Sequence, residues 1–93
     1  MNITKIKPDV NGNSRRVVHF LELLTEDEVR FCDQRTPELT QWPNSSTSYL
    51  YEKALSKARK IGGKKFHNRQ FGGGIVFQSY SDRELEARIL SVK

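Results

Sequence analysis

An amphipathic segment that ends on two glycines constrains this chain more than any other feature. Its apolar side chains recur three or four residues apart, as on one face of a helix over residues 48–61. They are Leu50, Tyr51, Ala54, Leu55, Ala58 and Ile61. Gly62 and Gly63 follow, and glycine ends helices because it adopts the left-handed conformation at little cost. The segment therefore predicts a helix that buries one face and stops before the glycine pair.

Two further helices are expected to begin at capping boxes. In Thr25–Glu28 and again in Ser81–Glu84, a hydroxyl residue precedes a glutamate by three positions, so that each can satisfy the other's backbone amide. The first box predicts a helix over about 26–34, and the second predicts a helix that runs towards the end of the chain. Thr36-Pro37 predicts a short helical turn between them, followed by a polar loop over 43–48.

Three apolar or alternating segments are predicted to be strands. Residues 15–24 are rich in Val, Leu and Phe on both alternating sets, which favours a central strand buried on both faces. Residues 65–70 and 75–80 flank the glycine-rich stretch 71–74 and are typical of an antiparallel hairpin. Residues 1–14 form either a flexible arm or a short strand that turns at its Asn-Gly pair.

A chain of 93 residues is long enough for one domain only. We therefore expect a single α+β domain over 15–93, preceded by the arm 1–14, with a small antiparallel sheet and three to four helices. The order of the elements is that of a winged helix–turn–helix. The longest apolar run, 17–24, is interrupted by polar residues and cannot span a bilayer. A single cysteine, Cys32, forms no disulfide within the chain, so a reducing cytoplasm is the expected compartment.

The positive charge of the chain is concentrated in one segment. The formal net charge is +5, but residues 22–52 carry a net −5, whereas residues 53–81 carry +7 and no acid at all. A basic patch of this kind is typical of a protein that binds a polyanion. Two alternatives remain: the lysines form a solvated face, or they pair with the acidic block of the same molecule.

The basic segment supplies the candidate nucleic-acid-binding residues. The set consists of Lys53, Lys57, Lys60, Lys64, Lys65, His67, Asn68 and Arg69. Lysine acts as a point charge, which indicates contact with the phosphate backbone more than selection of bases. We expect that replacing Lys53, Lys57 and Lys60 together by Glu abolishes binding and leaves the circular dichroism spectrum unchanged.

The remaining chemistry-bearing residues give weaker signals. His19 and His67 are two imidazoles that could act as the general acid and the general base in RNA cleavage, although His19 lies in an apolar strand. Trp42, Tyr49 and Tyr51 either stack on unpaired bases or complete the core. Two histidines and one cysteine far apart match no metal-ligand spacing, so neither a metal nor a cofactor is expected.

The sequence as a whole favours a small basic nucleic-acid-binding protein. We expect DNA rather than RNA as its partner, and a role in transcription regulation or as an accessory factor. The alternative is a small adaptor or inhibitor that binds a protein through its charged faces, and the third hypothesis is a ribonuclease of the toxin type.

Overall fold

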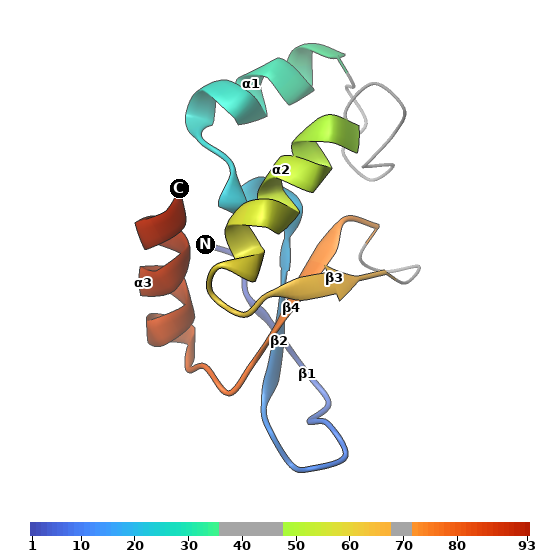
Figure 1. Ribbon diagram of the computed structural model, residues 1–93, viewed down its shortest axis with the longest axis vertical. Coiled ribbons are helices and arrows are strands. Elements are labelled where there is room, and N and C mark those ends of the chain that lie inside the picture. Colours follow the sequence, from blue (N-terminus) through green and yellow to red (C-terminus); the bar gives the residue numbers. More distant parts are fainter. Residues whose placement is uncertain (36–47, 68–71) are drawn as a thin grey trace.

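The computed structural model describes residues 1–35, 48–67 and 72–93 (Figure 1). The elements are β1 (Thr4–Ile6), β2 (Arg15–His19), the 3-10 turn η1 (Phe20–Leu23), α1 (Glu26–Arg35), α2 (Ser48–Arg59), β3 (Lys64–Phe66), β4 (Gly74–Gln78) and α3 (Asp82–Val92). This arrangement confirms the prediction of a small α+β domain. The short turn expected at Thr36-Pro37, most of the polar loop after it, and Asn68, Arg69 and Phe71 lie outside the described residues.

A four-stranded antiparallel sheet forms the centre of the molecule, with the strand order β1-β2-β4-β3. β2 pairs with β4 over its whole length, from Arg15 opposite Gln78 to His19 opposite Gly74. The neighbours Val17 and Val18 point to opposite faces of the sheet, and both are 1% exposed. β2 is therefore the central strand, buried on both faces, that the sequence predicted.

β2 is shorter than predicted, because the expected strand 15–24 ends at His19 and continues as η1. The pairing with β4 stops there: the Phe20 amide donates to the Gly73 carbonyl at 2.8 Å. The His19 imidazole then accepts a hydrogen bond from the Leu21 amide at 3.3 Å and caps the turn. An apolar run has no periodicity that distinguishes a strand from such a turn, so the sequence pattern missed this boundary.

The second hairpin is confirmed, and its strands begin one residue earlier than expected. β3 and β4 are antiparallel, with Lys65 opposite Ile75. β4 ends at Gln78 rather than at residue 80, because Ser79 takes the left-handed conformation (φ 65°) and turns the chain away from the sheet. The Ser79 amide donates to the Ser14 carbonyl at 2.8 Å, which closes this end of the sheet.

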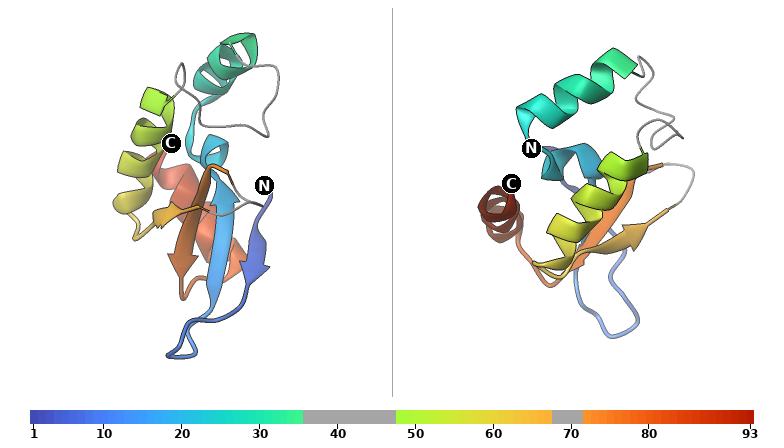
Figure 2. Two further views of the ribbon diagram at one scale, coloured as in Figure 1. Left: turned by 90° about the vertical axis from the view of Figure 1, so that its right-hand side faces the viewer. Right: turned by 45° about the horizontal axis from the view of Figure 1, so that its top comes forward.

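The core lies between one face of the sheet and the helices α2 and α3 (Figure 2). Val18, Ile75 and Phe77 come from the sheet, and Leu85 and Ile89 come from α3. The predicted apolar face of α2 supplies the rest, together with apolar side chains of η1 and the adjoining Leu24. The sequence thus identified the main buried face of the domain correctly.

Both predicted capping boxes are present. The Thr25 amide donates to Glu28 Oε1 at 2.8 Å, and the Glu28 amide donates to Thr25 Oγ1 at 3.3 Å. The Ser81 and Glu84 side chains exchange the same pair of hydrogen bonds at the start of α3. No helix within the described ranges is long and apolar enough to cross a membrane.

The end of α2 depends on a close contact at Gly63. The helix stops at Arg59, two residues before the predicted end, and the Gly63 amide donates back to the Ala58 carbonyl at 2.8 Å. A Cβ atom on Gly63 would lie 2.7 Å from Phe77 Cε1 and 2.9 Å from Ala58 Cβ. Gly62 differs, because its φ is +88° but nothing lies within 4 Å of its Cβ position.

We predict that Gly63→Ala lowers the free energy of unfolding by about 1–3 kcal/mol, because the added methyl group overpacks the core at Phe77. Urea denaturation followed by circular dichroism measures this loss. Gly62→Ala is the control, and its strained backbone is expected to cost about 1 kcal/mol without any steric overlap. A Gly63→Ala protein as stable as the wild type would show that β4 and α2 are not packed as described.

Candidate nucleic-acid interface

Two of the lysines of α2 form ion pairs with an acid of the same molecule. Lys53 Nζ lies 2.5 Å from Glu28 Oε2, and Lys57 Nζ lies 3.1 Å from Glu28 Oε1. The side chains of Lys57 and Glu28 are only 14% and 13% exposed, whereas that of Lys53 is 57% exposed. Two of the predicted site residues therefore join α2 to the acidic start of α1, which is the intramolecular pairing that the charge pattern left open.

The environment of Glu28 keeps its carboxyl group charged. Burial alone would raise the pKa of Glu28, but hydrogen bonds from Lys53, the Thr25 amide and Lys57 outweigh burial and lower the pKa to about 2. These ion pairs argue against the expectation that a triple Glu replacement at Lys53, Lys57 and Lys60 leaves the circular dichroism spectrum unchanged. Two of those replacements would place a carboxylate directly against the carboxylate of Glu28.

The exposed bases lie where α2 leads into β3. Lys60 is exposed in the turn after the helix, and Lys64 and Lys65 are exposed on the strand. Lys65 Nζ lies 5.7 Å from the centre of the Tyr51 ring, which is cation–π geometry. His67 is exposed just beyond the strand. Four of the predicted residues are therefore exposed along one continuous piece of chain, with Lys64 and Lys65 on opposite faces of β3.

Arg59 is an exposed base that the sequence reasoning left out of the site. It occupies the last position of α2, next to Lys60. Arg59 is one of the bases behind the charge of +7 over residues 53–81, and this charge count was the signal that could have found it. Its position adds a guanidinium group to the exposed set.

Two bases at the N-terminal end of the sheet hold the fold together. Arg16 Nε pairs with Asp82 Oδ1 at 2.5 Å, and its guanidinium group also donates to the Tyr80 carbonyl and to Ser14 Oγ. Arg15 Nε donates to the Lys7 carbonyl at 2.8 Å. Neither arginine is a free surface cation, although both count equally in the charge of the sequence.

The histidines differ in their surroundings. His19 is half-buried, and burial lowers its pKa because the charged imidazolium is poorly solvated there. Its Nδ1 atom is engaged by the Leu21 amide. His67 is exposed. His19 is therefore a satisfied, partly buried histidine and is poorly placed to take or give a proton to a substrate.

The aromatic side chains also differ in their exposure. Tyr51 is 4% exposed, packs edge-on against Phe20 with ring centres 5.2 Å apart, and donates its hydroxyl hydrogen to the Gly74 carbonyl at 3.4 Å. Tyr51 therefore belongs to the core, which was one of the two interpretations of its role. Tyr49 is exposed, and Trp42 lies outside the described residues.

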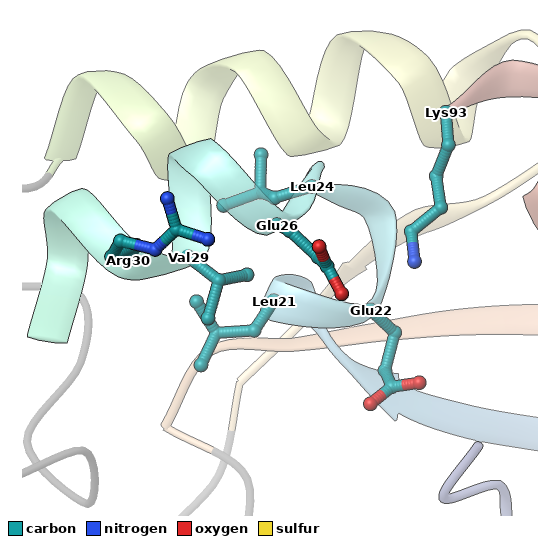
Figure 3. A pocket seen from close by; sticks show the side chains of 7 residues that line it. All are labelled: Leu21, Glu22, Leu24, Glu26, Val29, Arg30 and Lys93. Atoms are coloured by element: carbon teal, nitrogen blue, oxygen red, sulfur yellow. The ribbon is translucent and has the colours of Figure 1, made fainter.

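A shallow pocket of about 520 Å³ lies apart from the exposed bases, between η1, α1 and the end of α3 (Figure 3). Leu21, Leu24 and Val29 provide its apolar side chains. Glu22 and Glu26 line it together with Arg30 and Lys93. Its two carboxylates make it a poor site for a phosphate. Elsewhere in the described ranges, His, Cys, Asp and Glu side chains form no group of three that could hold a metal ion.

A family model described as the Staphylococcus phage terminal repeat-encoded protein TreK matches residues 1–91, nearly the whole chain. No curated protein and no solved structure matches the chain.

We predict that Glu28→Gln destabilises the protein at neutral pH by about 1–2 kcal/mol, because Lys53 and Lys57 lose a charged acceptor. The folded pKa of about 2 lies below the ordinary 4.5, so the wild type has this stabilisation above pH 4.5 and loses it as the pH falls towards 2. Urea denaturation across this range measures the difference. Glu86→Gln on the exposed side of α3 is the control, and a Glu28 effect that does not shrink on acidification would contradict the ion-pair assignment.

Proposed function

We propose that this chain, which belongs to the family of the Staphylococcus phage terminal repeat-encoded protein TreK, binds nucleic acid through the exposed bases between α2 and β3. DNA is the favoured partner, and a regulator of transcription or an accessory factor is the favoured role. The order of the elements, a helix pair followed by a β-hairpin, supports DNA as the partner by analogy with winged helices alone.

One observation carries the proposal: several exposed bases lie in a segment of the chain that contains no acid. Arg59, Lys60, Lys64 and Lys65 are all exposed, and no acid occurs anywhere in residues 53–81. Each such base can approach a phosphate and release its counterions, which gives affinity that depends steeply on salt. Most of the expected contacts are point charges from lysine, so the surface favours the backbone over base edges.

The structure narrows the set of residues on which the proposal rests. Lys57 is nearly buried against Glu28, and Lys53 shares the same carboxylate. The contact surface therefore consists of Arg59, Lys60, Lys64, Lys65 and His67, with Asn68 and Arg69 as the next candidates along the chain. Lys53 lies at the margin of this surface because more than half of its side chain is exposed.

The ribonuclease hypothesis has weaker support. Acid–base cleavage of RNA by two imidazoles requires both to reach the substrate. His19 is half-buried, with a lowered pKa and one ring nitrogen engaged, so His67 is the only exposed imidazole of the two. The adaptor hypothesis, in which the charged faces bind a protein partner, stays the alternative.

We predict that the double variant Lys60→Glu/Lys64→Glu binds nucleic acid at least tenfold more weakly than the wild type. The slope of log K against log salt is expected to fall by about 2, because each lost phosphate contact removes about 0.9. Fluorescence anisotropy with labelled duplex DNA, single-stranded DNA and RNA measures both quantities. Lys65 is left in place so that its contact with Tyr51 is kept.

The matched control is Arg83→Glu/Arg88→Glu, which makes the same change in net charge at exposed positions of α3. It is expected to keep most of the affinity if the surface between α2 and β3 is the site. Equal losses for the two double variants would show that net charge alone attracts the probe. Absence of wild-type binding to all three probes at low salt would overturn the proposal.

A further inference from the structure

Lys53 and Lys57 hold a single carboxylate between them. Lys53 Nζ lies 2.5 Å from Glu28 Oε2, and Lys57 Nζ lies 3.1 Å from Glu28 Oε1, so each oxygen of one acid is next to one ammonium group. Two ammonium groups one helical turn apart can hold a phosphate in the same way, because each lysine acts as a point charge. The Glu28 carboxylate therefore occupies the position in which these two lysines would otherwise bind an anion.

The occupied pair continues the exposed bases of the proposed surface. Lys53, Lys57 and Lys60 follow one another at spacings of four and three residues, which places them on one side of a helix. The Lys60 amide donates to the Lys57 carbonyl at 3.2 Å, so the helical path continues as far as Lys60. Lys60 is exposed, whereas the Lys57 side chain is only 14% exposed. Removal of Glu28 would thus extend the surface along α2 by two further bases.

α1, the helix that carries Glu28, is held to the domain through a small apolar contact. Among its described side chains, residues 26–30, Val29 packs partly buried against the core and none is fully buried. The pocket of about 520 Å³ lies between this part of α1, η1 and the end of α3 (Figure 3). α1 also lies at the edge of the domain, away from the sheet (Figure 1). Movement of α1 at its described residues would therefore expose little apolar surface.

A phosphate can replace Glu28 without leaving a charged group unpaired. The Thr25 amide donates to Glu28 Oε1 at 2.8 Å, and this capping bond lies within the first turn of α1 itself. The carboxylate therefore keeps a hydrogen-bond donor and the positive end of the helix dipole when α1 moves away from α2. The two lysines exchange a carboxylate for a phosphate. Because both sides stay paired, the exchange avoids the large cost of an isolated buried charge.

We infer that Lys53 and Lys57 form a second phosphate-binding subsite, which Glu28 covers in the free protein and which a nucleic-acid backbone uncovers by displacing α1. The inference rests on the proposed function, because the displacing phosphates belong to a nucleic acid already held at the exposed bases. α1 is then an autoinhibitory element. Its first turn also carries Glu26 and Asp27, and it keeps polyanions away from α2 until it moves.

The first test compares Glu28→Gln with the wild type, using whichever of the three labelled probes the wild type binds most tightly. Glu28→Gln is expected to bind about fivefold more tightly or better, because the phosphate no longer competes with a carboxylate. The assay is run in about 150 mM salt, where charges more than about 8 Å apart are largely screened. Since Glu28→Gln is also expected to be less stable, tighter binding would not reflect a larger folded fraction.

Two controls separate the subsite from a general effect of charge. Glu86→Gln makes the same change in net charge at an exposed position of α3, and we expect it to change the affinity less than about twofold. In a Lys53→Gln/Lys57→Gln background, Glu28→Gln is expected to add less than about twofold, because the bases that it uncovers are missing. The circular dichroism spectrum and an unfolding midpoint above the assay temperature confirm that each variant is folded.

Hydrogen exchange of the wild type provides a test that needs no variant. A saturating amount of the same nucleic acid is expected to speed amide exchange in α1 about fivefold or more, because a helix of ten residues without tertiary contacts is only marginally stable in water. Exchange in α2 is expected to stay unchanged or to slow. Unchanged or slower exchange in α1 would overturn the inference.

The outcomes distinguish this inference from the proposed function. Wild-type binding that Glu28→Gln does not strengthen, or that Glu86→Gln strengthens equally, would overturn the inference and leave the proposed function in place. A gain that persists in the Lys53→Gln/Lys57→Gln background would overturn it as well. Absence of binding by both the wild type and Glu28→Gln at low salt would overturn the proposed function together with the inference.

Discussion

The pairing of β2 with β4 is the interaction on which the rest of the structure depends. It joins residues 15–19 to residues 74–78, segments that lie almost sixty positions apart. Its register places Val18 beside Ile75 and turns both towards the helices. The same register brings the Gly73 carbonyl to the Phe20 amide, where the strand gives way to η1. At its other end, the Ser79 amide closes on the Ser14 carbonyl.

The charge distribution illustrates how a folded structure changes the meaning of a basic sequence. Glu28 accepts from the Thr25 amide and from two lysines of α2, so one carboxylate caps the start of α1 and also joins α1 to α2. Arg16 likewise joins β2 to the start of α3 through Asp82. These bases are part of the fold and are poorly available for a polyanion. The useful measure of a basic protein is therefore the number of exposed bases without a nearby acid.

Features that depend on neighbouring positions were predicted well from the sequence. Features that depend on residues distant in the sequence were not predicted. The two capping boxes and the apolar stripe of α2 involve positions three or four apart, so they can be recognised before the fold is known. The end of β2 at His19 depends on Gly73 and Gly74, and the partners of Lys57 depend on how α1 and α2 meet. The candidate site followed the same rule: the basic segment was visible in the sequence, but the pairing of Lys53 and Lys57 with Glu28 was not.

The exposed bases also have reasons within the fold. Arg59 is in the last turn of α2, where a positive charge complements the helix dipole. Lys64 and Lys65 lie on β3, an edge strand, where lysines oppose pairing with another sheet. Folding therefore accounts for some of the charge between α2 and β3 even without a ligand.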